Sequence, residues 1–313
     1  MARKIIFGAL VFALCAAMLL IAVAKGPKTA KTGAPHKVTV VTTLFPVYDM
    51  ARHIGDGKAD VYLLLPPGVE AHSFEPKPSD IVRISKADIF VYTDKYMEPW
   101  ADDIVRSVTN RDLIVVDAGR GTMELPAVSH DSDEPAGAPD PHIWLDFDNA
   151  KIMAGNIEAA FEAKDPADKD FYRQRLEDYR RKLSEMDAAY RSGLSHCRSS
   201  EIVFGGHYAL GYLAHRYGLK YVAAQGVSPD AEPTAGDLKN LVTQIRKQRI
   251  RYVFYEELSS PKIAETVAGE TDAKLLPLSA AHNVTRDQVE RGVTFFDILQ
   301  TDLQNLKTGL GCE

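Results

Sequence analysis

Residues 165–195 carry a repeat that limits what this chain can fold into more than any other stretch. Six apolar or aromatic side chains recur there at alternating spacings of four and three, which places them on one face of a helix: Tyr172, Leu176, Tyr179, Leu183, Met186 and Tyr190. Asp165 can cap the helix and Pro166 suits its first turn, whereas Gly193 is the first residue that weakens it. Such a helix is a rod of about 45 Å. It can be an ordinary helix within one domain, but we favour a rigid connector between two lobes.

The size and charge of the chain narrow the classes of protein that it can belong to. Its 313 residues, 45% of them hydrophobic, are enough for two domains of ordinary size. The net charge is −6, and basic residues are scattered, with no basic block beyond the N-terminal tail. These features argue against nucleic acid as a partner.

Residues 1–24 are typical of a signal peptide. They begin with two basic residues, continue without charge, and end in Ala-Val-Ala, a small-x-small cleavage motif. An uncleaved anchor is the alternative, because the uncharged run is long enough to span a bilayer. A lipoprotein attached through Cys15 is disfavoured, because Leu14 stands where a small residue is needed. In each case the bulk of the chain is exported. Residues 25–36 are expected to form a flexible tether.

Short β-branched segments alternate with helical ones on both sides of the predicted connector. The expected strands are residues 37–43, 59–65, 88–93, 113–117, 202–205, 221–224, 252–255 and 274–278. The expected helices outside the connector are residues 47–54, 79–86, 100–109, 149–163, 209–217, 237–248, 262–271 and 292–310. Two such runs predict an α/β protein of two lobes, each a mostly parallel sheet with helices on both faces. We therefore divide the exported chain into an N-terminal lobe (37–164), a connecting helix (165–195) and a C-terminal lobe (196–313).

Four of the nine histidines follow predicted strands, two in each lobe: His72, His142, His207 and His282. In open α/β sheets, ligands bind at the carboxyl ends of the strands. Imidazole nitrogen suits zinc, and four such ligands would complete a tetrahedral site. We therefore predict that these four side chains converge on one metal ion between the lobes.

Carboxylates near these histidines are further candidates. Glu256 and Glu257 follow the third expected strand of the C-terminal lobe, where they can be metal ligands or part of a solvated turn. Asp140 and Asp146 flank His142 and are placed to orient its ring. For the other histidines we favour surface, loop or packing roles: His36, His53, His130, His196 and His215.

Cys197 and Cys312 are the two cysteines that remain after cleavage of the signal peptide. In an oxidising compartment they can pair and tie the end of the connecting helix to the C-terminus. The sequence does not give their separation, so both a disulfide and two free thiols stay open.

With these residues in place, the chain resembles the metal-specific solute-binding proteins of ABC-type zinc and manganese uptake systems. The resemblance covers nearly the whole mature chain, through the connecting helix and the segments TTLFPVYDMARHIGDG, PPGVEAHSFEPKPSDI, PHIWLD, FGGHYALGYLAHRYGL and TFFDILQTDLQNLKTGL. It implies two α/β lobes joined by a rigid helix, with the metal between them. It matches the first three ligands of the family to His72, His142 and His207, and a histidine in third place implies zinc more than manganese.

The chain departs from the family pattern at the fourth ligand. The family commonly has an aspartate in a segment resembling LDPL, where this chain has residues 275–278, and Leu276 cannot bind a metal. We favour His282 as the substitute, and Glu256, Glu257 or the absence of a fourth protein ligand are the alternatives.

The resemblance implies an exported protein that captures zinc and delivers it to an ABC-type membrane permease, without catalysis and as a monomer. A site filled by three or four side chains has little room for the open position that catalytic zinc keeps. One alternative is a manganese- or iron-binding protein of the same class. Another is a metal-dependent hydrolase or chelatase with Glu256 or Glu257 as base, which the absence of an HExxH motif disfavours. A third is a surface adhesin that needs no metal.

Overall fold

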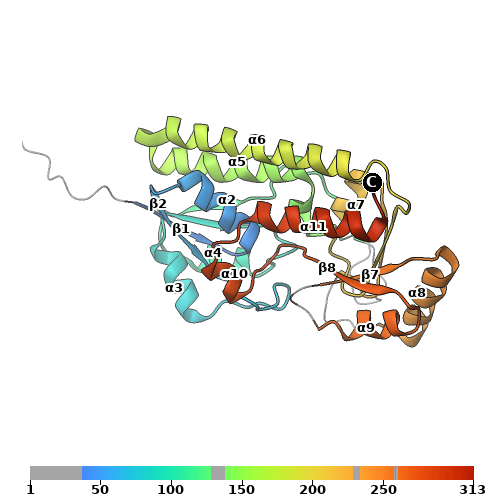
Figure 1. The fold of residues 1–313 in the computed structure, drawn as a ribbon. Helices are drawn as coiled ribbons and strands as arrows, with labels where there is room; N and C mark the ends of the chain where they lie inside the picture. Colours follow the sequence, from blue (N-terminus) through green and yellow to red (C-terminus); the bar gives the residue numbers. More distant parts are fainter. Residues whose placement is uncertain (1–36, 128–137, 228–232, 257, 259) are drawn as a thin grey trace, which may run out of the picture. The chain divides into compact units, whose positions relative to one another are not determined.

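Two four-stranded parallel sheets form the framework of the compact unit Val38–Glu313 (Figure 1). The computed structural model describes residues 37–127, 138–227, 233–256, 258 and 260–313. The predicted signal peptide and tether, His130 and Glu257 lie outside this described part. Within it, no helix combines the length and the apolar character that crossing a bilayer requires.

The first sheet has the strand order β2-β1-β3-β4, with every neighbouring pair parallel. Its strands are β1 (Val38–Thr42), β2 (Ala59–Leu63), β3 (Ile89–Tyr92) and β4 (Ile114–Asp117). Its helices are α2 (Phe45–Gly55), α3 (Pro78–Lys86), α4 (Ala101–Ser107) and α5 (Phe147–Lys164). Alternate side chains of β1 enter different cores: Val40 packs on the face that α2 and α5 cover, and Val41 on the face of α3 and α4. Helices therefore cover both faces.

The second sheet repeats this plan with the order β6-β5-β7-β8, again parallel throughout. Its strands are β5 (Glu201–Phe204), β6 (Lys220–Ala223), β7 (Tyr252–Glu256) and β8 (Lys274–Leu278). Its helices are α7 (Gly211–Tyr217), α8 (Ala235–Gln248), α9 (Lys262–Gly269) and α11 (Phe295–Leu310). The short helix α10 (Arg286–Glu290) lies in the chain between β8 and α11. Val203 and Val253 pack with α8 and α9 on one face, and Phe204 and Phe254 belong to the core on the other. The predicted fold class is confirmed.

The connecting helix forms as a short 3-10 turn, Pro166–Asp168, followed by α6 (Lys169–Gly193), which lies along α5 (Figure 1). Five of the six repeat residues are buried and Met186 is partly buried. The Tyr190 hydroxyl donates to the Leu299 carbonyl of α11 at 2.7 Å, and the Tyr179 hydroxyl lies 3.3 Å from Asp49 of α2. The helix therefore contacts helices of both halves of the chain.

The predicted start of the last helix, expected over residues 292–310, is wrong. The structure has a separate short helix, α10, and begins α11 only at Phe295. Gly292 has a φ of +69°, which ends helical geometry, and Thr294 caps α11 by accepting from the Asp297 amide. The Thr285–Gln288 capping box before α10 was the sequence signal for the additional helix.

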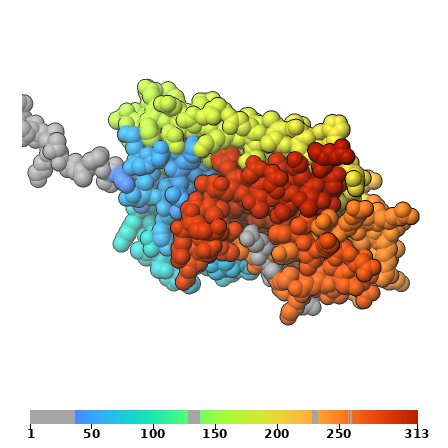
Figure 2. Space-filling view, viewed as in Figure 1, coloured from blue at the N-terminus to red at the C-terminus, as the bar shows by residue number. Residues whose placement is uncertain are grey.

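One large hydrophobic cluster runs continuously between the two sheets, and each sheet has a smaller cluster on its other face. The segment after β8 crosses to the N-terminal half, where Phe45 and Gly68 donate backbone N–H groups to the carbonyls of His282 (3.2 Å) and Val284 (2.9 Å). The Trp144 indole donates to the Ala280 carbonyl at 2.7 Å. In the space-filling view, the C-terminal residues (red) lie against the N-terminal half (blue), consistent with these bonds (Figure 2). Large independent movements of the two halves would break this packing.

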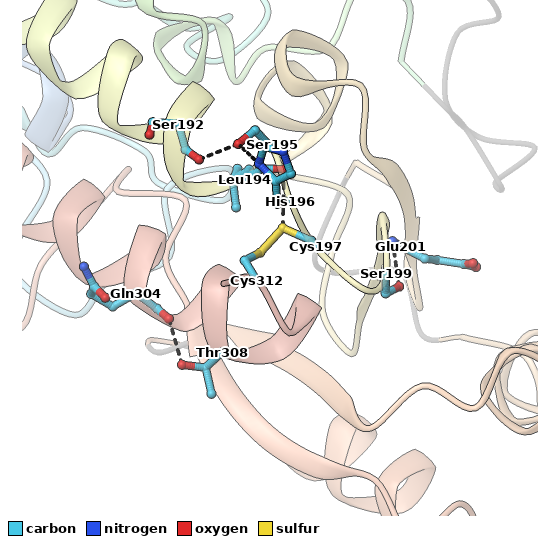
Figure 3. The surroundings of a disulfide bond; sticks show 10 residues. All are labelled: Ser192, Leu194, Ser195, His196, Cys197, Ser199, Glu201, Gln304, Thr308 and Cys312. Carbon is cyan, nitrogen blue, oxygen red and sulfur yellow. Dashed lines mark hydrogen bonds between the residues drawn. A yellow bond between two sulfur atoms is a disulfide. The ribbon is translucent and has the colours of Figure 1, made fainter.

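Cys197 and Cys312 form a disulfide across 115 residues of sequence (Figure 3). Beside it, Arg198 and Ser199 donate backbone N–H groups to the carbonyls of Gly311 and Leu310. The sequence left open whether these cysteines form a disulfide or stay as free thiols, and the structure contains the disulfide. The bond fixes the end of α11 to the chain that leads from α6 into β5.

Leu183 tests whether the buried face of α6 stabilises the whole compact unit. Its side chain is fully buried, so Leu183→Ala should lower the free energy of unfolding by about 2–5 kcal/mol. Gln174→Ala, on the exposed side of the same helix, should change it by no more than about 0.5 kcal/mol. Denaturant unfolding of both variants gives the comparison, and equal effects would contradict this role of α6.

Candidate metal centre

Each of the four predicted histidines lies beyond the carboxyl end of a strand. His72 follows β2, His207 follows β5 and His282 follows β8, while His142 lies between β4 and the 3-10 turn Ile143–Leu145 that leads into α5. The loops after parallel strands open at one edge of each sheet, so these side chains can meet between the two edges.

Helix α9 packs closely against the turn that carries His207, and two glycines make this possible. A Cβ atom on Gly205 would lie 2.5 Å from the Cβ of Ala264 in α9, so no larger residue fits there. The next residue is also glycine, and a Cβ on Gly206 would come within 2.8 Å of the Phe204 ring. The glycine pair therefore lets the chain leave β5 sharply and places His207 directly after the strand.

Three imidazoles converge with their Nε2 atoms facing one another. The Nε2 atoms of His72 and His142 are 3.2 Å apart, and those of His207 and His142 are 3.3 Å apart. One ring nitrogen from each of the three lies within 4.8 Å of the other two, close enough for all three to hold a single metal ion. His142 and His207 are buried, and His72 is partly exposed.

A carboxylate lies behind two of these rings. His142 Nδ1 is 2.8 Å from Asp140 Oδ1, which also accepts from the His142 backbone N–H at 3.0 Å. His207 Nδ1 is 2.8 Å from Glu256 Oε2. A carboxylate accepts hydrogen bonds, so each Nδ1 carries the proton and each Nε2 presents a lone pair to the common point. This hydrogen bond between Asp140 and His142 Nδ1 supports the predicted orienting role of Asp140.

Asp146, predicted to orient His142 as well, does not contact that ring. Its carboxylate caps α5 by accepting from the N–H groups of Asp148 and Asn149, and it pairs with Arg216. The physical reason is that Asp146 follows the 3-10 turn, which carries its side chain to the start of the next helix.

The electrostatics of the site favour neutral imidazoles at two positions. Burial, together with the neighbouring histidines, holds the pKa of His72 and that of His142 well below the usual range. Burial acts in the same direction on His207, but the adjacent Glu256 carboxylate outweighs it and raises the pKa of His207. Burial raises the pKa of Asp140 to about 7, opposed by the hydrogen bond from the His142 backbone. His72 and His142 are therefore uncharged at neutral pH, the form that binds a metal.

His282 lies beside the three converging histidines without joining their closest cluster. Its ring centroid is 5.9 Å from that of His207 and 6.3 Å from that of His72. Its Nε2 is directed to Glu256, 3.5 Å from Oε1. The preceding Ala281 has a φ of +57°, a left-handed conformation that is rare for alanine and is held here by packing and by the Ser279 hydroxyl.

Two features of the site were not foreseen from the sequence. Glu256 was a candidate ligand, yet its carboxylate lies behind His207 and joins that ring to His282. Trp144 packs on His142 with ring centroids 5.5 Å apart, and its indole bond to Ala280 ties the His142 segment to the His282 segment. The tryptophan of the PHIWLD segment was the available sequence signal. A buried Trp needs an acceptor for its N–H, so its presence could have predicted a bond to another segment.

Imidazoles backed by carboxylates, brought together from two parallel sheets that a long helix connects, define a metal-binding protein of two α/β lobes. A family model described as zinc-uptake complex component A, periplasmic, matches residues 40–309. The chain belongs to this family of solute-binding proteins of ABC uptake systems, whose members are transport components and not enzymes.

Individual proteins similar to this chain support the family assignment. The chain is 35% identical over 310 residues to the high-affinity zinc uptake system protein ZnuA of Bacillus subtilis, covering 96% of each protein. It is 33% identical over 291 residues to the zinc-binding protein AdcA of Streptococcus pyogenes serotype M1, of which it spans only 56%. The crystal structure of the Zn(II)-bound ZnuA-like domain of Streptococcus pneumoniae AdcA is similar, with a TM-score of 0.76 at 31% identity, covering 88% of this chain and 99% of that one.

Glu256→Gln tests whether the carboxylate behind His207 contributes to metal binding. The amide loses the negative charge that supports the Nδ1 proton, so zinc affinity should fall by about 10-fold or more. Glu265→Gln, an exposed carboxylate on α9, is the matched control and should leave affinity unchanged. Competition with a chromophoric chelator measures both variants. Equal affinities would show that Glu256 does not act on the site.

Proposed function

We propose that this protein captures zinc outside the cytoplasm and delivers it to an ABC-type membrane permease. The observation that carries the proposal is the convergence of the Nε2 atoms of His72, His142 and His207, which come from both sheets, on one point. The family description and the names of the zinc-binding relatives support the same cargo.

Zinc fits the donor set better than manganese or iron. Three imidazole nitrogens form the cluster, and the nearby carboxylates of Asp140 and Glu256 are engaged with the Nδ1 side of the rings. Imidazole suits zinc, whereas manganese favours sites rich in oxygen ligands. A manganese- or iron-binding protein of the same class remains the second candidate, with Glu256 turned toward the ion.

We propose His282 as the fourth ligand. Its ring centroid distances to His207 and His72, 5.9 and 6.3 Å, are only slightly longer than the 5.2–5.3 Å between the rings of the three converging histidines. A turn of the ring away from Glu256 would bring Nε2 toward the common point, while Glu256 keeps its bond to His207. Glu256 or Glu257 as direct ligand is the alternative.

The geometry also weakens the hydrolase or chelatase alternative. A general base must face the water that a metal activates. Glu256 lies on the Nδ1 side of His207, opposite to the Nε2 atom that faces the cluster. Its position suits a group that holds the ligand ring and not one that takes a proton from a bound water.

Release of the ion is proposed to depend on small movements and on docking to the permease. We keep residues 37–164 and 196–313 as two lobes about the connecting helix, but their shared core limits hinge opening. The N-terminal 24 residues are proposed to direct export and to be cleaved, with residues 25–36 as a tether and the mature protein acting as a monomer.

Elemental analysis of protein purified without added metal is the direct test of the proposed cargo. One zinc per chain is expected, and it should be lost in His72→Ala, His142→Ala and His207→Ala. His282→Ala should retain weaker binding, and His215→Ala, on an exposed helical position, should bind like the unmodified protein. Protein without any transition metal would contradict the function, and full affinity in His282→Ala would overturn the fourth ligand alone.

Zinc affinity should fall as the pH is lowered from 7.5 to 5.5. Protons compete with the metal for Nε2, and His207 is protonated first because its pKa is raised, whereas those of His72 and His142 are lowered. One competing proton predicts a loss of roughly tenfold per pH unit below the pKa of His207. Competition titrations at several pH values measure the slope, and constant affinity would contradict the proposed ligands.

A further inference from the structure

An arginine with a largely buried side chain joins segments that lead to two of the converging histidines. Arg216, on α7, contacts three carboxylates and is only 8% exposed. Its Nη1 lies 3.0 Å from both oxygens of Asp146 and 3.0 Å from Asp148. Its Nε and Nη2 each lie 2.8 Å from one oxygen of Asp187, on α6. The guanidinium therefore bridges the start of α5, the connecting helix and α7.

The bridged segments are those that carry two of the three converging histidines. Asp146 follows His142 by four residues, with only the 3-10 turn Ile143–Leu145 between them. Arg216 follows His207 by nine residues, along the loop and the helix α7. A shift of α7 relative to the start of α5 would therefore change the 3.3 Å separation of the two Nε2 atoms.

The contact has the geometry of a strong, directional ion pair. The two parallel bonds to Asp187 use the planar fork of the guanidinium, which a lysine cannot reproduce. Burial would raise the pKa of Asp187, but the bonds from Arg216 and from the Tyr217 hydroxyl (2.8 Å) outweigh it and lower that pKa to about 2. Asp146 is fixed independently as the cap of α5. Each partner is thus held in place by a second interaction.

We propose that Arg216 is a positioning residue for metal binding. By holding α7 against α5 and α6, it sets the spacing of His142 and His207 and so determines how tightly, and for how long, the ion is kept. Arg216 does not touch the ion. A chelating set must be held to within about 0.5 Å of its working geometry, so a displacement smaller than a bond length is enough to weaken it. This proposal rests on the proposed function, in which the three histidines bind zinc.

Arg216→Lys and Arg216→Gln test the proposal in the full mature chain. Lysine keeps the positive charge but lacks the planar guanidinium group, and glutamine lacks both. We expect each to bind one zinc per chain with about 10-fold weaker affinity and a correspondingly faster loss of zinc to a chelator. Asp187→Asn removes the charge of the carboxylate that Arg216 binds with two bonds, and it should also lower zinc affinity. If the Arg216 variants do not fold, this variant tests the proposal in their place. Arg181→Lys is the matched control, because Arg181 pairs with Asp178 and Glu185 on the exposed face of α6.

A readout of ligand geometry separates positioning from mere stabilisation. The visible absorption bands of Co²⁺ bound in place of zinc report the symmetry of the ligands, and they should shift in the Arg216 variants but not in Arg181→Lys. Variants that lose thermal stability yet keep zinc affinity within about twofold and an unchanged cobalt spectrum would overturn the proposal. Failure of the unmodified protein to bind zinc would instead reject the proposed function, so the two failures can be told apart.

Discussion

The hydrogen bonds between ring Nδ1 atoms and buried carboxylates are the interactions on which the metal centre depends. Asp140 and Glu256 each hold one imidazole at 2.8 Å and thereby turn its Nε2 toward the shared point. Because the carboxylates act from behind, they leave the front of the cluster to nitrogen donors, which favours zinc. Glu256 also lies near His282, so a single side chain influences two potential ligands.

The frame around the centre is built to keep these groups at fixed distances. The long helix α6 contacts both halves, the core runs without interruption between the sheets, and the segment after β8 hydrogen-bonds to the N-terminal half. Trp144 and Arg216 add polar ties between segments that carry histidines of the site. A frame of this kind suits a protein that must hold an ion with little rearrangement and give it up at a second protein.

The sequence predicted the parts of this structure that depend on local pattern. The Tyr and Leu repeat of α6 and the alternation of strands and helices follow from side-chain periodicity, and both were found. The placement of histidines after strands follows from the topology of parallel sheets. The resemblance to a family supplied the order of the three proposed ligands, His72, His142 and His207.

What the sequence did not provide depends on side-chain direction in three dimensions. Glu256 was predicted just after a strand and Asp146 beside His142, but whether a carboxylate faces the ion, a ring or a helix end is set by neighbours distant in sequence. The partner of Asp146 is Arg216, which is 70 residues away, and the partner of Glu256 is His207, which is 49 away. The separate helix α10 was missed because its pattern is too short for periodicity to detect.

Anomalous diffraction from crystals of the zinc-loaded protein, collected on both sides of the zinc absorption edge, tests the central claim most directly. The account predicts one strong peak at about 2.0–2.1 Å from the Nε2 atoms of His72, His142 and His207 together. A peak bound by fewer than these three rings, or zinc located elsewhere on the chain, would contradict it.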